Sequence, residues 1–143
     1  MSELISRLSL NQITLNQLSL IECIDVCLRH NVSWIAPWRN KVAEIGLSES
    51  ARVIRESGLK VSGLCRGGYF CEPEAIDDNR RAIDEAAALG AGTLVLVCGP
   101  APDRNIDAAR RKVADGVAAI VRNRRHAVTV PSRQRAASGV QEA

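Results

Sequence analysis

The sequence predicts an α/β fold in which four strand–helix units build a parallel sheet. Strand-like segments start near residues 7, 33, 60 and 93, at spacings of 26, 27 and 33 residues. A strand, a helix and the return to a parallel strand need about 30 residues. Amphipathic segments lie between these strands, and glycine or asparagine ends them shortly before the next strand, as is typical of α/β proteins.

The first unit starts at residues 7–11, where polar and apolar side chains alternate as in a strand. Ser19 and Glu22 have the spacing of a capping box, which predicts a helix from residue 20. Asn31 follows this helix in a position suited to a left-handed cap. We expect the helix to bury a face made of Leu20, Ile21, Ile24, Cys27 and Leu28, with Cys23 also inside.

The second and third units follow the same pattern. Residues 33–37 form a second short strand. Ser48 is placed to cap a helix that continues to about residue 57, and Gly58 ends it. Residues 60–64 then form the third predicted strand.

The helix of the third unit is favoured to start at the acidic residues 72 and 74, and Gly90 ends it. The fourth strand then has the most apolar run. Residues 93–97 form the fourth strand, which lacks polar alternation, so we expect both of its faces to be covered. A last helix is predicted over residues 106–121.

The repeat stops after residue 121, and a basic tail follows. Residues 122–143 carry five arginines against Glu142, whereas residues 1–121 carry 14 basic and 15 acidic residues. We therefore expect a domain over 1–121 and a disordered tail over 122–143, and the near-neutral domain argues against nucleic-acid binding. The abrupt change also suggests the hypothesis that the gene is truncated or frameshifted.

Several classes of protein are disfavoured. The five cysteines are an odd number and include no C-x-x-C pair, which argues against a disulfide framework. No apolar stretch reaches the roughly 18 residues that span a bilayer, and the N-terminus has no export signal pattern. We therefore expect a cytoplasmic protein without a membrane segment.

Two architectures fit four strand–helix units: a small doubly wound sheet, and half of a (β/α)₈ barrel. A dinucleotide-binding sheet would carry G-x-G-x-x-G after its first strand, but residues 11–16 contain no glycine. The pattern alone leaves both architectures open.

Residue identities at the strand ends carry a resemblance. SLNQ at 9–12, PWR at 37–39, CRGGYF at 65–70 and LVLVCG at 94–99 come in an order that resembles the N-terminal half of the sugar phosphate isomerase/epimerase family, the xylose-isomerase-like TIM barrels. This resemblance covers about residues 7–121. It implies a partial TIM barrel, a half barrel of four consecutive parallel β/α units.

The resemblance also implies a chemistry. Such enzymes interconvert aldoses and ketoses, or epimerise sugars, while a divalent metal (Mn, Mg or Zn) stabilises an enediolate and carboxylates move the proton. The family places its metal ligands and carboxylates on later strands. Here the histidines are His30 and His126, and the predicted strand ends carry no acid. We therefore assign no metal site and no catalytic residue, and expect weak or no activity from this chain.

The substrate-side loops do offer binding candidates. Arg66 could hold a phosphate or carboxylate, with Gly67 letting the backbone approach the ligand. Trp38 could wall a sugar pocket to which Arg39 adds charge, and Asn11 could bond a sugar hydroxyl. The structural alternatives are an arginine in a glycine-shaped turn, rim packing by Trp38 and an ordinary turn asparagine.

The expected ligand is a small sugar or sugar phosphate. A half barrel leaves its first and last strands as open edges, so two copies could pair there as a homodimer. The alternative function is a non-catalytic α/β module that binds a small anion or a protein partner.

Overall fold

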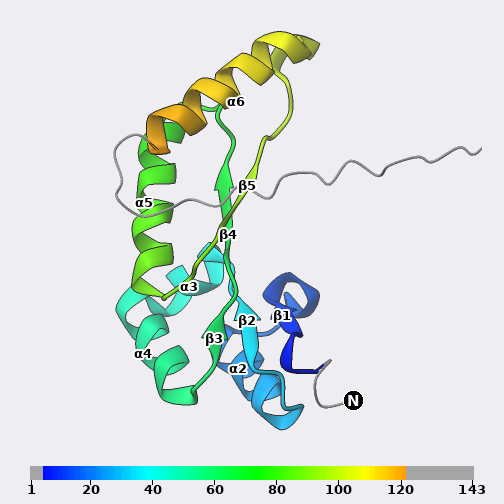
Figure 1. The fold of residues 1–143 in the computed structure, drawn as a ribbon, viewed down its shortest axis with the longest axis vertical. Coiled ribbons are helices and arrows are strands. Elements are labelled where there is room, and N and C mark those ends of the chain that lie inside the picture. Colours follow the sequence, from blue (N-terminus) through cyan, green and yellow to red (C-terminus); the bar gives the residue numbers. More distant parts are fainter. Residues whose placement is uncertain (1–4, 122–143) are drawn as a thin grey trace, which may run out of the picture.

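The computed structural model describes residues 5–121, and the predicted basic tail lies outside them (Figure 1). Five strands alternate with α-helices and two 3₁₀ turns. In chain order they are β1 (Ser9–Asn11), η1 (Gln12–Leu15), α2 (Leu20–Arg29), β2 (Trp34–Ala36), α3 (Arg39–Ile45), α4 (Leu47–Ser57), β3 (Lys60–Val61), β4 (Leu64–Gly68), α5 (Ala75–Ala88), β5 (Leu94–Val97), η2 (Pro102–Arg104) and α6 (Ile106–Val121).

Every pair of neighbouring strands is parallel, which confirms the predicted mixed α/β class. β1, β2 and β3 form one small sheet in that order, and β4 pairs with β5 in another. In the first sheet Leu10, Ile35 and Val61 lie side by side in register. Parallel pairing of this kind requires a crossover on one side of the sheet, and the helices between the strands supply it.

The predicted third strand is interrupted, so its expected boundaries are wrong. β3 is bonded to β2, because Lys60 N donates to Ser33 O and Ser62 N donates to Ile35 O, both at 3.0 Å. After the break the chain turns to the other neighbour, and Leu64 N donates to Thr93 O at 2.9 Å. Gly63 lies at the break, where a Cβ would come 3.3 Å from that same Thr93 oxygen.

The second crossover contains two helices where one was predicted. Gly46 stands between α3 and α4 with φ of +86°, a conformation that costs glycine little and other residues much. It therefore ends one helix and begins the next. Ser48 lies inside the first turn of α4 and does not cap it, so that prediction is wrong.

Other helix boundaries agree with the sequence. The Ser19 hydroxyl accepts from Glu22 N, and the Glu22 carboxylate accepts from Ser19 N at 2.8 Å, so the capping box is formed. These bonds, led by the one from the Ser19 backbone, lower the pKa of Glu22. Asn31 and Gly58 have positive φ at the ends of α2 and α4, as predicted.

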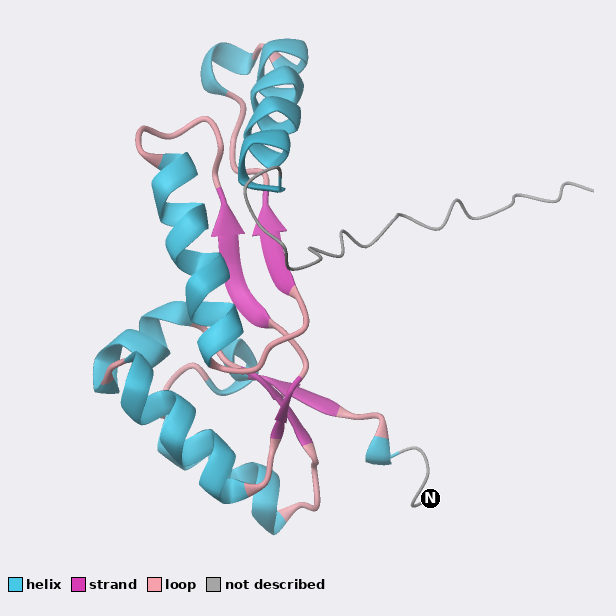
Figure 2. Cartoon of the chain, turned by 60° about the vertical axis from the view of Figure 1, so that its left-hand side comes forward, coloured by secondary structure: helices cyan, strands magenta, loops and turns pink. Residues whose placement is uncertain are grey.

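The helices gather on one side of the strands (Figure 2). The core lies between the two layers and is formed by side chains that include Leu20, Cys23, Ile24, Cys27, Ile35, Ile54, Val61, Leu64, Ile83 and Leu94. The burial of Cys23 and Cys27 is confirmed. Ile21 and Leu28 are 51% and 49% exposed, so their expected burial is wrong: the buried face of α2 is centred on the cysteines instead.

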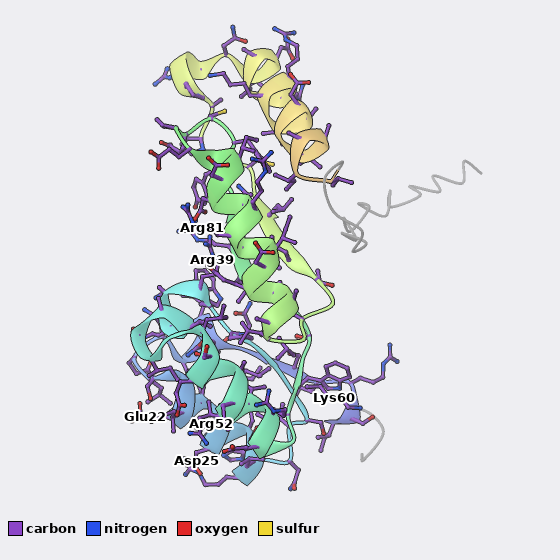
Figure 3. All side chains as sticks on the ribbon, turned by 90° about the vertical axis from the view of Figure 1, so that its left-hand side faces the viewer. Glu22, Asp25, Arg39, Arg52, Lys60 and Arg81 are labelled. Atoms are coloured by element: carbon purple, nitrogen blue, oxygen red, sulfur yellow. The ribbon has the colours of Figure 1, made fainter. Side chains whose placement is uncertain are left out.

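The opposite side of the strands is open. Val95, in the middle of β5, is 42% exposed, so the expectation that both faces of this strand are covered is wrong. Lys60 points away from the helices (Figure 3). Within residues 5–121, no helix is both long and apolar enough to cross a membrane.

Candidate functional site

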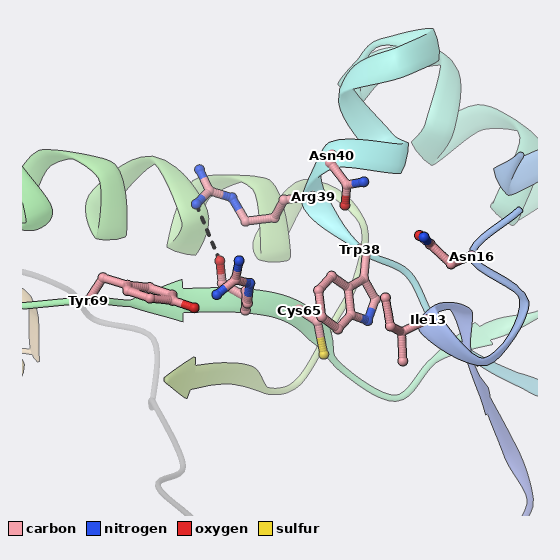
Figure 4. A pocket seen from close by; sticks show the side chains of 8 residues that line it. Ile13, Asn16, Trp38, Arg39, Asn40, Cys65 and Tyr69 are labelled. Atoms are coloured by element: carbon pink, nitrogen blue, oxygen red, sulfur yellow. Dashed lines mark hydrogen bonds between the residues drawn. The ribbon is translucent and has the colours of Figure 1, made fainter. Parts of the chain in front are cut away.

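A cavity of about 360 Å³ opens where β2 and β4 end, at the edge where parallel α/β sheets hold their ligands. Three segments supply its walls: η1 with the residue after it, the β2–α3 junction, and β4 with the residue after it (Figure 4). The lining residues are Ile13, Asn16, Trp38, Arg39, Asn40, Cys65, Arg66 and Tyr69.

Arg66 is one of the two arginines that line this cavity. Its guanidinium lies 4.6 Å from the centre of the Tyr69 ring and 5.7 Å from that of the Trp38 ring, so it is stacked between two aromatic faces. Its side chain is half-buried, and within residues 5–121 it has no carboxylate partner. A guanidinium held in this way keeps its donors available for an anion.

The end of β4 is shaped to bring Tyr69 to this place. The register against β5 shifts between Cys65 and Gly67. Gly68 then takes a φ of +108° and lies against the backbone of Val97, where a side chain has no room. Tyr69 N donates to Val97 O at 2.7 Å, which fixes the tyrosine beside Arg66.

Arg39 has its charge already balanced. Its guanidinium bonds the Asp78 carboxylate at 2.8 and 3.0 Å and that of Glu85 at 2.6 and 3.1 Å. It also donates to the backbone oxygen of Arg66 at 3.4 Å, the dashed line in Figure 4. The bonds from Arg39 lower the pKa of Asp78, and those carboxylates raise the pKa of Arg39. Arg39 therefore ties α3 to α5 and β4.

Asn11 supports the cavity wall. Its Oδ1 accepts a hydrogen bond of 2.8 Å from Trp38 Nε1 and one of 3.4 Å from Ile13 N. The neighbouring Gln12 is buried, and its Oε1 accepts from Trp38 N at 3.1 Å. Both amides hold Trp38 from β1 and η1, and so they fix the ring on which Arg66 stacks.

Gly67 faces the helices, away from the cavity. A Cβ there would collide with Oδ1 of Asn79. Asn79 is fully buried: its Oδ1 accepts from Gly68 N at 2.6 Å, and its Nδ2 donates to Gly68 O at 2.7 Å and to Ala75 O at 2.8 Å. The space left by Gly67 thus serves the packing of α5 against β4.

The sequence correctly indicated that Arg66, Trp38 and Arg39 lie close together, but it did not indicate several of their neighbours. Tyr69 is the single tyrosine of the chain and follows CRGG directly, a signal that could have identified it. Asn16 and Asn40 carried no comparable signal, because asparagine is common in loops and turns.

The cavity does not fit the divalent metal that the family resemblance implies. In the described part of the chain no three His, Cys, Asp or Glu side chains are grouped so that they could hold an ion. Cys65 is the one lining residue with a thiol, and burial raises its pKa, which favours the protonated form that binds metals poorly. We therefore derive no step through a metal.

Comparisons with known proteins support the fold. No protein-family model and no curated protein matches the chain. The crystal structure of protein SMc04130 from Sinorhizobium meliloti 1021 is 52% identical, with a TM-score of 0.78 over 82% of this chain and 46% of that one. A xylose isomerase domain containing protein from Salmonella typhimurium LT2 is 13% identical, with a TM-score of 0.59 over 81% and 47%.

Most of this chain matches each of the two proteins, and it spans about half of the length of each. The Salmonella match, at low identity, speaks for the fold alone. The chain thus has an α/β fold with parallel strands that is similar to part of a xylose isomerase domain containing protein.

Proposed function

We propose that this chain is half of a sugar isomerase/epimerase-like β/α barrel and that it binds the anionic end of a sugar. The parallel strands pair in chain order, with the third predicted strand bonded first to β2 and then to β5, which is the order around a barrel wall. The similarity to a xylose isomerase domain containing protein, over about half its length, supports the same architecture.

The observation that carries the binding role is the state of Arg66. A half-buried guanidinium normally has a carboxylate beside it, because burial of an unpaired charge costs free energy. Arg66 has two aromatic faces instead and opens into the cavity at the strand ends. A phosphate or carboxylate of a small ligand would supply the missing partner, bound through two of its oxygens.

The surrounding charges favour one negative charge over two. Arg39, the other cation in the cavity wall, is bonded to both Asp78 and Glu85 and so adds no net positive charge. Arg66 alone then faces the ligand. A sugar acid, with a single carboxylate, suits one guanidinium better than a phosphate dianion does, so we place it ahead of the sugar phosphate.

The cavity offers few side chains that could transfer a proton. This favours the second candidate function, a non-catalytic binding module, for the chain by itself. Isomerisation needs a base and an acid within reach of the substrate carbons. Asp78 and Glu85 are held by Arg39, and the pKa of the Cys65 thiol is raised by burial. We therefore propose that the described domain is a binding module with weak or no turnover. Isomerisation would need an acid and a base other than the groups described.

Ligand binding can be followed by tryptophan fluorescence. The chain has two tryptophans, so a Trp34→Phe variant leaves Trp38, which stacks on Arg66, as the sole emitter. It should be titrated with an aldonate, a pentose phosphate and a neutral pentose. We expect the aldonate to bind best and the neutral sugar at least about tenfold more weakly, since a charged hydrogen bond contributes about 1.5–3 kcal/mol.

Arginine variants separate the site from a general charge effect. Arg66→Ala should lose at least about tenfold in aldonate affinity, and Arg66→Lys should keep part of it because the charge remains. Arg110→Ala is the control, since Arg110 is an exposed arginine on α6 paired with Asp107. Equal affinity for all three sugars, or an Arg66→Ala variant that binds as before, would refute the anion site.

Activity is a separate question. An isomerase assay of the chain on a panel of ketoses, with added Mn²⁺ or Mg²⁺, tests the proposal that it binds its ligand without turnover. We expect no turnover above background. Turnover that Arg66→Ala abolishes would replace the binding module with an active isomerase built on the same cavity.

A further inference from the structure

Two side chains in the wall of the candidate site use all of their hydrogen-bond donors within the protein. The guanidinium of Arg39 has five N–H groups and makes five hydrogen bonds, to two carboxylates and one backbone oxygen. The single N–H of the Trp38 indole donates to Asn11. These side chains therefore shape the cavity without offering a donor to a ligand.

The hydroxyl of Tyr69 is a donor that the protein leaves unused. Tyr69 is half-buried and its ring lies 4.6 Å from the Arg66 guanidinium, yet its hydroxyl has no hydrogen-bond partner among the residues that the structure describes. Figure 4 shows this hydroxyl on the side of the ring that faces Trp38, toward the cavity. A tyrosine O–H removed from water usually has a partner. Here it offers a ligand an uncharged donor next to the arginine.

The backbone after β5 holds the tyrosine ring in this place. Gly99 has a φ of +76°, and a Cβ there would lie 2.9 Å from Cδ1 and 3.4 Å from Cε1 of Tyr69. The ring thus occupies the space that a side chain at position 99 would need. Because Tyr69 N also donates to Val97 O, the ring is held by β5 and by the residue two positions after it.

An acid bound by Arg66 would bring its next carbon close to this hydroxyl. A guanidinium binds a carboxylate through both oxygens, and the carboxylate carbon is one bond from the neighbouring carbon of the acid. A hydroxyl on that carbon lies beside the carboxylate, where a second donor next to the guanidinium can reach it. In a sugar phosphate an ester oxygen separates phosphorus from the first carbon, so the sugar hydroxyls lie further from the anion.

We infer that Tyr69 is a second ligand-binding residue, which together with Arg66 selects acids that carry a hydroxyl on the carbon next to the carboxylate, and that Gly99 is the positioning residue for its ring. The inference rests on the anion site of the proposed function and narrows its ligand class to 2-hydroxy acids, which include the aldonates. The hydroxyl adds a donor and no charge, in keeping with a site for one negative charge.

Two ligands that differ by one hydroxyl test the inference. The Trp34→Phe chain, in which Trp38 is the one emitter, is titrated with an aldonate and with the matching 2-deoxyaldonate. We expect the aldonate to bind about fivefold more tightly, which is the contribution of one net hydrogen bond. Tyr69→Phe keeps the ring that stacks on Arg66, so it should lose about fivefold in aldonate affinity and nothing for the 2-deoxyaldonate.

Glycine variants test the positioning of the ring. Gly99→Ala should lower aldonate affinity at least about fivefold, because the new Cβ displaces Tyr69. Gly90→Ala is the matched control: Gly90 has a φ of +71° and nothing within 4 Å of its Cβ position, so the variant carries similar backbone strain without a collision.

A double variant separates positioning from a general loss of structure. When Tyr69→Ala has removed the ring, Gly99→Ala should cause no further loss of aldonate affinity, because nothing is left to displace. An effect of Gly99 on folding alone would lower the affinity in both backgrounds. Tyr69→Phe carries the test of the hydroxyl even if Gly99→Ala fails to fold.

Three outcomes would overturn the inference and leave the anion site intact. They are equal affinity of the parent chain for both acids, unchanged aldonate affinity in Tyr69→Phe, and an equal loss of both acids in that variant, which would make Tyr69 only a support for Arg66. Failure of the proposed function looks different. The parent chain would then bind neither acid, or Arg66→Ala would bind as the parent does, and the role of Tyr69 would fall with it.

Discussion

The two faces of the strands differ in how far their side chains are buried. On the helix side Ile35, Val61 and Leu94 are buried, and Asn79 reaches in from α5 to bond the N–H and C=O of Gly68. On the open side Val95 is 42% exposed, Lys60 lies over the Trp34 ring, and Ser62 bonds to Ser9. The buried core lies on the first face, so matched substitutions on the two faces should differ widely in their effect on stability.

The largest difference is expected between two polar side chains. Asn79→Ala leaves the buried N–H and C=O of Gly68 without partners and should lower the free energy of unfolding by about 3 kcal/mol. Ser62→Ala removes the exposed hydroxyl bond to Ser9 and a long bond of 3.5 Å to Ile35 O, and it should cost less than about 0.5 kcal/mol. Urea unfolding at pH 7 measures both, and similar losses would mean that the open face is as structured as the covered one.

The next comparison is between two valines, one on each face, that are both replaced by alanine. Val61→Ala removes two buried methyl groups next to Ile35 and should cost about 2 kcal/mol. Val95→Ala acts on a side chain that is 42% exposed and should cost about 0.5 kcal/mol in the chain alone. Urea unfolding of both variants at pH 7 measures the two losses. Equal losses would mean that Val95 is packed as well as Val61.

A third comparison concerns charge and pH. Arg39→Ala leaves the carboxylates of Asp78 and Glu85 unpaired and should cost about 1–2 kcal/mol at pH 7, whereas Lys60→Ala should change stability by less than about 0.5 kcal/mol. The pKa of Asp78 is lowered by Arg39, so its stabilising effect is present above its ordinary pKa of 3.8 and is lost as pH falls through its lower folded value.

The cost of Arg39→Ala should therefore be smaller at pH 3 than at pH 7, because Asp78 in the unfolded chain takes up a proton below its ordinary pKa of 3.8. Unfolding curves of the parent and variant at both pH values give the difference. A cost independent of pH would show that Arg39 acts by packing its side chain and not through these carboxylates.

The smallest of the expected losses on the covered side is at the start of α2. Ser19→Ala removes the hydroxyl that accepts from Glu22 N and should cost about 1 kcal/mol. Thermal unfolding of the parent and the variant measures the loss. An unchanged melting temperature would show that the capping bond contributes nothing to stability.

The sequence predicted the covered face better than the open one. The capping box at Ser19, the left-handed ends at Asn31 and Gly58 and the burial of Cys23 and Cys27 follow from local rules, and the structure agrees with each. The fold class follows from the same regular spacing. Such features depend on residues a few positions apart, which a sequence displays directly.

What the sequence concealed depends on distant neighbours. The break between β3 and β4 arises because residues 60–62 bond to β2 and Leu64 bonds to Thr93, which is a matter of the whole sheet. Arg39 was expected to face a ligand, but its position opposite Asp78 and Glu85 depends on how α5 packs. The exposure of Val95 depends on which face of β5 the helices cover, and an apolar strand looks the same in the sequence whether one face or both are covered.

The break in the third strand has a consequence for unfolding. Because β3 belongs to one small sheet and β4 to the other, the two sheets are joined along the backbone through residues 62 and 63 and by a bridge between Trp38 and Cys65. Cooperative units seen by amide hydrogen exchange often coincide with such supersecondary blocks. The amides of β4 and β5 should thus open together, with protection distinct from that of β1 to β3, and the Cys65 N–H bond of 3.0 Å to Pro37 O would mark the seam between them.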